Sequence, residues 1–516
     1  MYRYIFTILR LWAPYITKTT FMQATNFDSE FCGNLPIHHI NTIQPHGAII
    51  LLDKKNLSII QASVNSVDYL GCSLQELLDT TLTELTGRDL TDLEETFAQA
   101  IKKKAVLSLT VNEKPLMTLV SAHELYYLLE MQVDDVQIKS KFGGLQQVRE
   151  LVSALETTTA LQETCDLVVS ELKKLLGIDG VMMYKFDAAW NGTVISELKS
   201  ESLEPYLGVT FPASDVPKQA RELYLKNPIR LIPNRDYQAA RLYPVINPLT
   251  NSFSDLSSCF LRGVADVHLE YMTNMQVMAS MSLRVIHNGK LWGLISCNHS
   301  TVFNLSFEDC ENLALLTNVI STKISSIINN DEYQFVSDLQ KSRNQLVDAI
   351  YKDGLVKGIF NTQVSVLDLF QGSGAVLYLK GKQHTAGDTP DSNFLDNLHL
   401  WLQAKDITQI YATHHLVGAL EDAADFSEKA SGMLVIPLAG AEANYLVCFR
   451  PEVVKTVEWG GNPHQAINFE ADSSTYHPRH SFKIWLETVN QTSQPWHEQE
   501  LQIASTIRSF LLEYKS

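Results

Sequence analysis

The chain has 516 residues, with 41 Lys and Arg against 58 Asp and Glu, and a formal net charge of −17. This acidic balance argues against broad nucleic-acid binding, which needs a basic surface. The length predicts roughly three or four domains, and the hydrophobic share of 45% is ordinary for a globular protein. The cysteines are scattered and form no CxxC pair, which argues against a zinc knuckle or a disulfide framework and favours a reducing cytoplasm.

Residues 1–27 are predicted to form a leader outside the folded domains. The segment is apolar but carries Arg3, Arg10 and Pro14, and no apolar run reaches the roughly 18 residues that cross a bilayer. No small-residue cleavage site stands out, which argues against a signal peptide. We expect a flexible or amphipathic leader, and the sequence leaves a weak membrane contact open.

Three α+β domains are expected in the rest of the chain. In the first, residues 28–145, apolar runs predict helices at 74–78 and 90–101 and strands at 48–53, 57–64, 106–111 and 126–133. In the second, residues 146–328, we expect a helix over 148–176 and strands at 180–186, 194–198, 279–287 and 290–297. Asn288-Gly289 joins the last two strands and is typical of a tight hairpin.

A long helix is expected to lead from the second domain into the third, residues 329–516. It starts at a capping box at Ser306 and continues towards Tyr351. Strands are predicted at 375–379, 432–438 and 445–450, and the polar segment 457–485 is interpreted as a functional or disordered loop. Near the end, Ile503, Ile507, Phe510 and Tyr514 lie at heptad spacing, which predicts a coiled-coil seam.

One stretch, Phe211-Pro212-Ala213-Ser214-Asp215-Val216-Pro217, places an aromatic ring, a carboxylate and two prolines ahead of a helix. Asp215 is expected to cap that helix, with Pro217 in its first turn. The same pattern is typical of an ordinary cap and surface turn, so the stretch alone does not identify a site.

Together with other motifs, this stretch resembles the photosensory core of bacterial phytochromes. Cys32 with Pro36-Ile37-His38, followed by residues 43–47 (IQPHG), is similar to the attachment segment of that family. Residues 267–272 and 292–295 resemble its GAF domain, and residues 478–482 (PRHSF) with Trp485 and Glu487 resemble the tongue of its PHY domain. The motifs occur in the family order PAS, GAF, PHY over residues 28–514.

The resemblance implies a red/far-red photoreceptor that holds an open-chain tetrapyrrole. Two propionates call for arginine forks and hydroxyls, and a flat conjugated body calls for aromatic and methionine side chains. The backbone carbonyl of Asp215 and the ring of His268 are expected to bond the pyrrole N–H groups, partly through a water. Taken singly, each residue better suits an ordinary structural role, and only the set as a whole favours the ligand. The implied chromophore-binding residues are Tyr184, Phe211, Asp215, Val216, Pro217, Tyr224, Arg230, Arg262, His268, Tyr271, Ser280, Ser282 and Asn298.

Covalent attachment requires a thiolate that attacks a vinyl group. Plant and cyanobacterial members carry this thiol immediately before the histidine equivalent to His268, where this chain has the unreactive Val267. Cys32 lies where biliverdin-binding members carry theirs, so the resemblance implies biliverdin IXα in a thioether link. Cys259 and Cys297 are interpreted as buried structural thiols.

Asn298 departs from the family, which usually has a histidine near the ring D carbonyl. An amide can donate the same hydrogen bond but cannot carry charge, so dark reversion is expected to differ. His299 is next on the strand and should face the other way. The implied switch is a salt bridge between Asp215 and Arg479, which photoisomerisation breaks. The tongue, about residues 457–490 with Ser481, Trp485 and Glu487, would then refold from hairpin to helix.

The resemblance further implies a homodimer through helical spines, a figure-of-eight knot crossing near residues 37–43, and a C-terminal helix that signals to an output module or response regulator. No kinase or cyclase motif is visible in this sequence, so we expect no enzymatic turnover. From the cysteine spacing and the acidic charge we also expect no metal and no nucleic-acid partner.

Two alternatives stay open. One is a GAF-type sensor of a small ligand such as a cyclic nucleotide, and the other is a hydrolase using Asp215 and His268 as acid and base.

Overall fold

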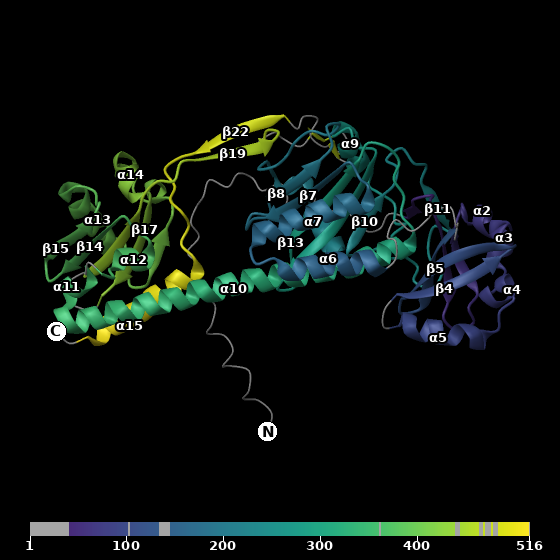
Figure 1. Cartoon of the computed structure of the whole chain (residues 1–516), viewed down its shortest axis with the longest axis horizontal. Coiled ribbons are helices and arrows are strands. Elements are labelled where there is room, and N and C mark those ends of the chain that lie inside the picture. Colours follow the sequence, from purple (N-terminus) through teal and green to yellow (C-terminus); the bar gives the residue numbers. More distant parts are fainter. Residues whose placement is uncertain are drawn as a thin grey trace, which may run out of the picture.

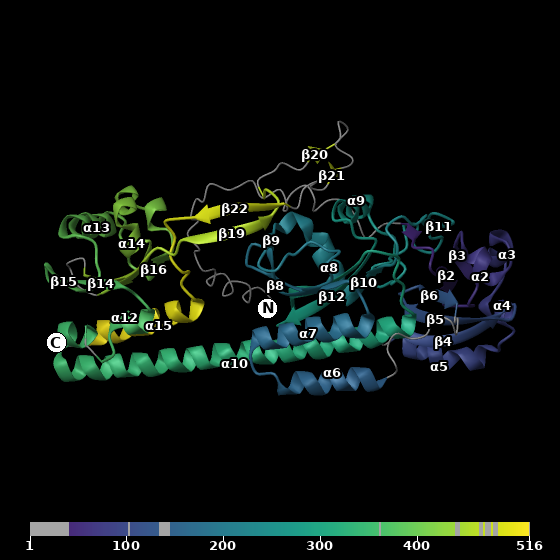
Figure 2. The same cartoon turned by 45° about the horizontal axis from the view of Figure 1, so that its top comes forward.

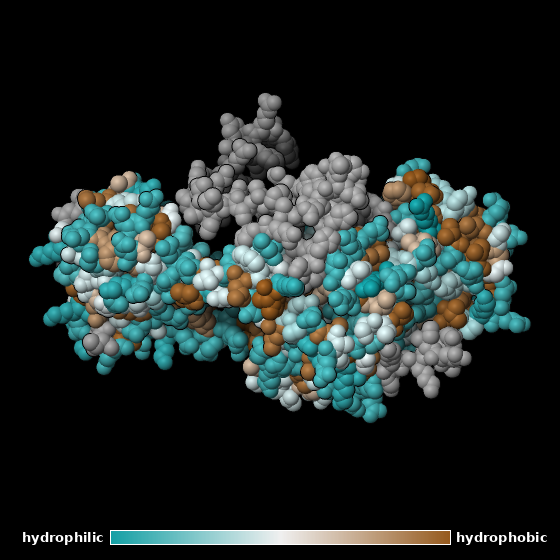
Figure 3. All heavy atoms as spheres, turned by 90° about the horizontal axis from the view of Figure 1, so that it is seen from above, coloured by the Kyte–Doolittle hydropathy of each residue, from teal (hydrophilic) through white to brown (hydrophobic). Residues whose placement is uncertain are grey.

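The computed structural model describes residues 41–101, 104–133, 145–360, 363–438, 444–463, 468–469, 476–477 and 483–514. The expected leader, Cys32, Arg479 and Ser481 lie outside these residues. Three α+β units follow one another along helix α10 (Phe307–Asp353), as Figure 1 shows. Seen from above, the described surface is mainly hydrophilic, with hydrophobic residues in separate patches (Figure 3). No helix within the described residues is long and apolar enough to cross a membrane.

The first unit is a seven-stranded sheet in the order β1-β11-β3-β2-β6-β5-β4. Burial alternates along β4, so one side of each strand faces a core that includes Phe97 of α5. The predicted strands are present, and β5 is an additional one. The bounds are β1 (Thr42–Ile43), β2 (Ala48–Asp53), β3 (Ile59–Ser63), β4 (Ala105–Val111), β5 (Lys114–Ala122), β6 (Tyr126–Val133), α2 (Ser66–Leu70), α3 (Leu74–Leu78), α4 (Leu82–Thr86) and α5 (Leu90–Ala100).

The second unit has a central antiparallel sheet, with α7 and the first half of α10 against one face and α8 towards the other. The single helix expected over 148–176 is wrong. A new helix starts after Ala160 because the Glu163 carboxylate accepts the Thr159 N–H at 3.0 Å. The bounds are α6 (Leu145–Thr157), α7 (Leu161–Leu176), β7 (Gly180–Phe186), β8 (Gly192–Lys199), β9 (Thr210–Phe211), η2 (Ala213–Asp215), α8 (Lys218–Lys226), β10 (Ile229–Ile232), β11 (Ala240–Tyr243), α9 (Asp266–Asn274), β12 (Ala279–His287) and β13 (Lys290–His299).

Residues 42–44 join the first unit to the second. β1 pairs with β11 on one side, and Ile43 bridges to Arg262 on the other. Residues 42–43 therefore lie between strand β11 and residue 262. These two neighbours are the ends of one continuous segment of the second unit. The knot also depends on residues before 41, which lie outside the described residues, so it stays a prediction.

Helix α10 begins as predicted, because the Ser306 hydroxyl accepts the Asp309 N–H at 3.1 Å. Its 47 residues span about 70 Å at 1.5 Å per residue. It ends in the third unit, whose sheet has the order β15-β14-β18-β17-β16. The bounds are α11 (Leu355–Ile359), α12 (Val366–Phe370), β14 (Gly374–Leu379), β15 (Lys382–Gly387), α13 (Ser392–Ala404), β16 (Tyr411–Thr413), η3 (Leu416–Gly418), η4 (Glu421–Phe426), α14 (Ser427–Ala430), β17 (Gly432–Pro437), β18 (Tyr445–Arg450) and α15 (Glu498–Glu513).

The heptad positions of α15 face the chain's own core. Ile503 and Ile507 are buried beneath the third sheet, and the rings of Phe510 and Tyr514 pack on Tyr351 of α10. The expectation of a coiled-coil seam was therefore wrong for these residues, because the spacing reflects packing within this chain.

A hairpin reaches back from the third unit to the second (Figure 2). It consists of β19 (Lys455–Gly460) and β22 (Ile484–Val489), and β19 pairs in parallel with β9 through Trp459 and Thr210. The second sheet thereby gains two strands, in the order β10-β12-β13-β7-β8-β9-β19-β22. The prediction of a loop over 457–485 was therefore wrong at both ends, where residues 457–460 and 484–485 belong to β19 and β22. Between them, β20 (Asn468–Phe469) pairs with β21 (Tyr476–His477).

Candidate functional site

A polar row lies on the face of the second sheet that points away from α7. The register pairs Arg230 with Ser282 across β10 and β12, and Ser280 with Asn298 across β12 and β13. Side chains alternate along strands, so these four share one face, while the neighbouring Met281 and Leu283 are fully buried on the helix side. Arginine, hydroxyl and amide groups are therefore gathered on one surface.

Two arginines lie close together at one end of this row. Arg230 donates two hydrogen bonds of 2.7 Å, to the backbone oxygens of Arg262 and Gly263. Burial, and then the charge of Arg262, lower the pKa of the Arg230 guanidinium to about 9. Burial also lowers the pKa of Arg262. An anion bound between the two guanidinium groups would relieve this repulsion.

The first unit contributes to the same place. The Gln44 amide donates to the backbone oxygens of Leu231, at 3.0 Å, and Arg262, at 3.3 Å. Burial and the charge of Arg230 lower the pKa of His46 to about 4. Both residues belong to the IQPHG motif at 43–47, which by itself indicates no specific role for either of them. The sequence does contain a signal for a polar role, because Gln44 and His46 are polar residues flanked by apolar strand segments.

Helix α9 brings His268 and Tyr271 to one side of itself, since residues three apart are neighbours on a helix. Their rings are nearly parallel, with an interplanar angle of 9° and centroids 6.0 Å apart. Burial among neighbouring atoms, and then the charges of Arg230 and Arg262, lower the pKa of the His268 imidazole to about 4. A pKa this far below 7 favours the neutral form of the imidazole at pH 7.

Asp215 accepts a hydrogen bond of 3.1 Å from the hydroxyl of Tyr271. The expectation that Asp215 caps α8 was wrong, because Pro217 is the N-cap residue and Asp215 ends the short helix η2. Arg221 of α8 reaches back and donates to the Val216 oxygen at 2.6 Å. The stretch is therefore held by Arg221 and Tyr271, and its carboxylate points towards α9.

Aromatic side chains cover the rest of the face. Tyr184 and Phe211 are buried with ring centroids 6.0 Å apart, and Tyr206 meets Phe211 edge-on at 5.5 Å. Burial raises the pKa of the Tyr224 hydroxyl, and a hydrogen bond with Ser282 opposes this shift in part. Sequence reasoning did not single out Tyr206, because a lone Tyr in a loop carries no motif. The sheet therefore offers a polar region and an aromatic region next to each other.

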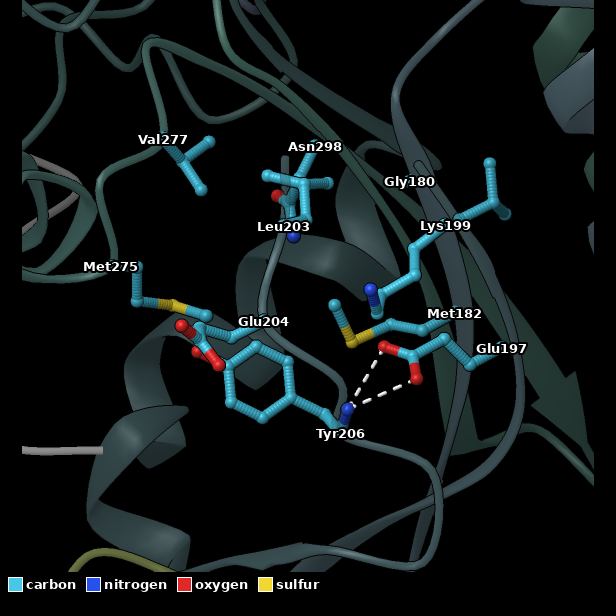
Figure 4. A pocket seen from close by; sticks show the side chains of 11 residues that line it. Gly180, Met182, Glu197, Lys199, Leu203, Glu204, Tyr206, Met275, Val277 and Asn298 are labelled. Atoms are coloured by element: carbon cyan, nitrogen blue, oxygen red, sulfur yellow. Dashed lines mark hydrogen bonds between the residues drawn. The ribbon is translucent and has the colours of Figure 1, made fainter. Parts of the chain in front are cut away.

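Asn298 lines a small pocket and accepts a hydrogen bond of 3.3 Å from Ser280. Figure 4 shows Asn298 among the side chains that line this pocket, together with Met275 and Tyr206, and Glu197 accepts the Tyr206 backbone N–H. The Nδ1 atom of His299 instead lies 3.0 Å from a carboxylate oxygen of Asp179 and accepts the Asp179 N–H at 3.2 Å. The amide, and not the imidazole of the next residue, therefore belongs to the pocket.

The hairpin meets the site through Phe211. A Cβ atom on Gly460 would lie 2.6 Å from the Phe211 ring, so β19 approaches Phe211 as closely as glycine permits. Within the hairpin, Trp459 pairs with Trp485, and its indole N–H donates to Glu487 at 2.7 Å. The backbone of β21 lies against α9. The expected partner Arg479 follows β21 by two positions but lies outside the described residues, as does Ser481.

The thiols in the second unit are poor nucleophiles. Burial raises the pKa of Cys297 to about 12 and that of Cys259 well above its ordinary value. None of the described cysteines forms a disulfide, and the described residues hold no group of three or more His, Cys, Asp or Glu able to bind a metal.

Comparisons with known proteins give one family. Family models match a PAS fold at residues 32–136, a GAF domain at 160–324 and a Phytochrome region at 339–515. Cyanobacterial phytochrome B of Nostoc sp. is 35% identical over 497 residues, and the match covers 94% of this chain but 66% of that relative. The crystal structure of a bacteriophytochrome from R. palustris matches with a TM-score of 0.79 at 30% identity, covering 93% of this chain and 98% of that one. The photosensory core module of a Stigmatella aurantiaca phytochrome matches with a TM-score of 0.75 at 32% identity, covering 93% and 97%.

Proposed function

Because the chain belongs to the phytochrome family of red/far-red photoreceptors, we propose that it is a photosensory core that binds biliverdin through a thioether to Cys32. The observation that carries the proposal is the shared face of the second sheet. Arg230, Arg262 and Ser282 form its cationic and polar region, next to the aromatic region of Tyr184 and Phe211. A flat ligand with two carboxylates fits both regions at once.

Each group on this face has a physical role towards such a ligand. When bound, the bilin supplies the absorption of light and the double-bond isomerisation. Arg230 and Arg262 bind its propionates, which offset the repulsion between the two guanidinium groups. The backbone oxygen of Asp215 accepts hydrogen bonds from the pyrrole N–H groups, and the neutral ring of His268 accepts or returns a proton at one nitrogen. Val216, Pro217, Tyr224, Ser280 and Asn298 complete the proposed set of binding residues.

Biliverdin, as opposed to another bilin, is proposed from the position of the available thiol. The residue before His268 is Val267, which cannot react, and the high pKa values of Cys259 and Cys297 keep them protonated. Cys32 lies where biliverdin-binding members of the family carry their thiol, and it is the proposed nucleophile. Cys32 precedes the segment 42–46 that lies beside the arginines, so the chain can bring it to the same end of the site.

The tongue is proposed to be the signalling element. In the structure its described strands form a hairpin on the second sheet, which suits the resting state. A salt bridge from Arg479 to Asp215 is consistent with β21 lying against α9 and with Tyr271 of α9 bonding Asp215. Isomerisation would break that bridge, and Ser481, Trp485 and Glu487 would exchange partners as the tongue becomes helical.

The chain's place in a larger protein is also a proposal. We assign residues 28–145, 146–328 and 329–516 to the PAS, GAF and PHY domains. We expect a cytoplasmic homodimer that pairs through the helices of the last two domains. Since the chain spans 66% of the Nostoc relative, α15 would pass the signal to an output module, such as a histidine kinase or diguanylate cyclase, or to a response regulator.

Co-expression with a biliverdin source tests the proposal against the rival small-ligand sensor, which the phytochrome relatives do not favour. The wild-type protein should be coloured and should show zinc-induced fluorescence on a denaturing gel. Cys32→Ala should lose the gel fluorescence, whereas the control Cys72→Ala, at a partly exposed thiol of the first unit, should keep it. A colourless protein would favour the rival, and fluorescence that survives Cys32→Ala would refute the proposed tether.

A further inference from the structure

Arg450 lies where the two roots of the tongue meet the start of α15. It is the last residue of β18, five positions before β19 leaves the third unit. Its guanidinium donates to the oxygens of Gln494, at 3.4 Å, and Pro495, at 2.9 Å, on the returning segment. Figures 1 and 2 show this segment running from β22 down to α15.

The same side chain holds the first turn of α15. Arg450 and Glu500 form an ion pair with an N–O distance of 2.5 Å, and their side chains are only 4% and 1% exposed. Glu500 also accepts the His497 N–H at 2.8 Å, just ahead of the helix. The indole of Trp496 stacks on the guanidinium at 3.8 Å and donates its N–H to the Thr413 oxygen. The direction in which α15 starts therefore depends on Arg450.

Arg450 has no unused hydrogen-bonding capacity in this arrangement. Two further bonds go to the Phe370 oxygen, so its five N–H groups make five hydrogen bonds to three separate segments. A planar guanidinium cannot tilt without disturbing all of them. Stability alone does not call for such a pair, because apolar residues of similar volume stabilise a buried site as well or better.

We propose that Arg450 is a positioning residue that transmits movement of the tongue roots to α15 through Glu500. This inference rests on the proposed photosensory function. When the tongue refolds, it displaces residues 490–495, which lie between β22 and α15. The backbone oxygens of Gln494 and Pro495 in this segment accept hydrogen bonds from the Arg450 guanidinium. The guanidinium then carries the displacement to the first turn of α15, while Ile503 and Ile507 keep the rest of that helix on the core.

The main test replaces the buried pair with apolar residues, Arg450→Met with Glu500→Leu, in biliverdin-loaded full chain. Since a single substitution leaves a buried charge unpaired, the double variant is the one that preserves folding, and Arg450→Lys tests the fork alone. The control removes the exposed pair Lys429 and Asp388 of the same unit, whose atoms lie 2.8 Å apart. Three readouts are followed in dark and light: the absorption spectrum, the amide infrared signal of the tongue and hydrogen exchange in α15.

We expect the double variant to photoconvert and refold its tongue like the control, while the light-to-dark ratio of exchange rates in the first turn of α15 falls to about one. Arg450→Lys should give an intermediate ratio. A wild-type ratio in the double variant, or in Arg450→Lys if the double variant does not fold, would overturn the coupling while leaving the photosensory function intact. A wild-type protein without any photoconversion would instead overturn the proposed function, and the coupling with it.

Discussion

Replacing His46 with Asn should make the protein less sensitive to acid. His46 belongs to the first unit, yet burial and the charge of Arg230 in the second unit lower its pKa from 6.5 to about 4. A base with a lower pKa in the folded state binds fewer protons there, so acid favours unfolding. The stabilisation is complete above pH 6.5 and is lost as the pH falls towards 4.

The size of the effect follows from the two pKa values. The full difference between 6.5 and 4 is worth about 3.4 kcal/mol, of which about 2 kcal/mol is already lost at pH 5. His46 is partly exposed, and solvent screening reduces the expected loss to about 1 kcal/mol. Asparagine does not titrate, so the variant should keep this amount of stability between pH 8 and pH 5.

Urea unfolding at pH 8, 6 and 5 measures this directly. The drop in unfolding free energy from pH 8 to pH 5 should be smaller for His46→Asn than for wild type by about 1 kcal/mol. His384→Asn, on strand β15 of the third unit, is the matched control and should follow the wild type. An identical drop in His46→Asn and wild type would refute the lowering of the His46 pKa by burial and by Arg230.

Three further predictions concern the tongue and the pocket. Gly460→Val should loosen the hairpin by about 1–3 kcal/mol, because its side chain would overlap the Phe211 ring, and amide exchange in β19 should accelerate; unchanged exchange would contradict this packing. Asn298→His should change the rate of dark reversion, followed by absorption after illumination, and an unchanged rate would make this position a bystander. Arg479→Ala should bind biliverdin normally but form less photoproduct, since Asp215 loses its proposed partner, whereas a wild-type photoproduct spectrum would rule the switch out.

The sequence predicted the elements whose signals are local. The capping hydroxyl of Ser306 marked the start of α10, and strand patterns located β12, β13 and the Asn288-Gly289 turn between them. The prediction of a three-domain α+β fold is confirmed. It was possible because the order and spacing of the motifs can be recognised in a single sequence.

Features that depend on distant partners could not be predicted in this way. Nothing local to Gln44 indicates that it would bond oxygens near residues 231 and 262. Asp215 looked like a helix cap because the tyrosine that bonds it is 56 positions away. The heptad of α15 looked like a seam for another helix, since spacing alone does not say which surface the apolar residues meet.

The most direct test of the whole account is a single difference spectrum. Purified protein loaded with biliverdin is recorded in the dark and again after red light, with Cys32→Ala beside it. We predict a reversible loss of red absorption and a gain in the far-red for the wild type. A pigment that washes off the wild-type protein, or a bound pigment whose spectrum does not respond to light, would contradict it.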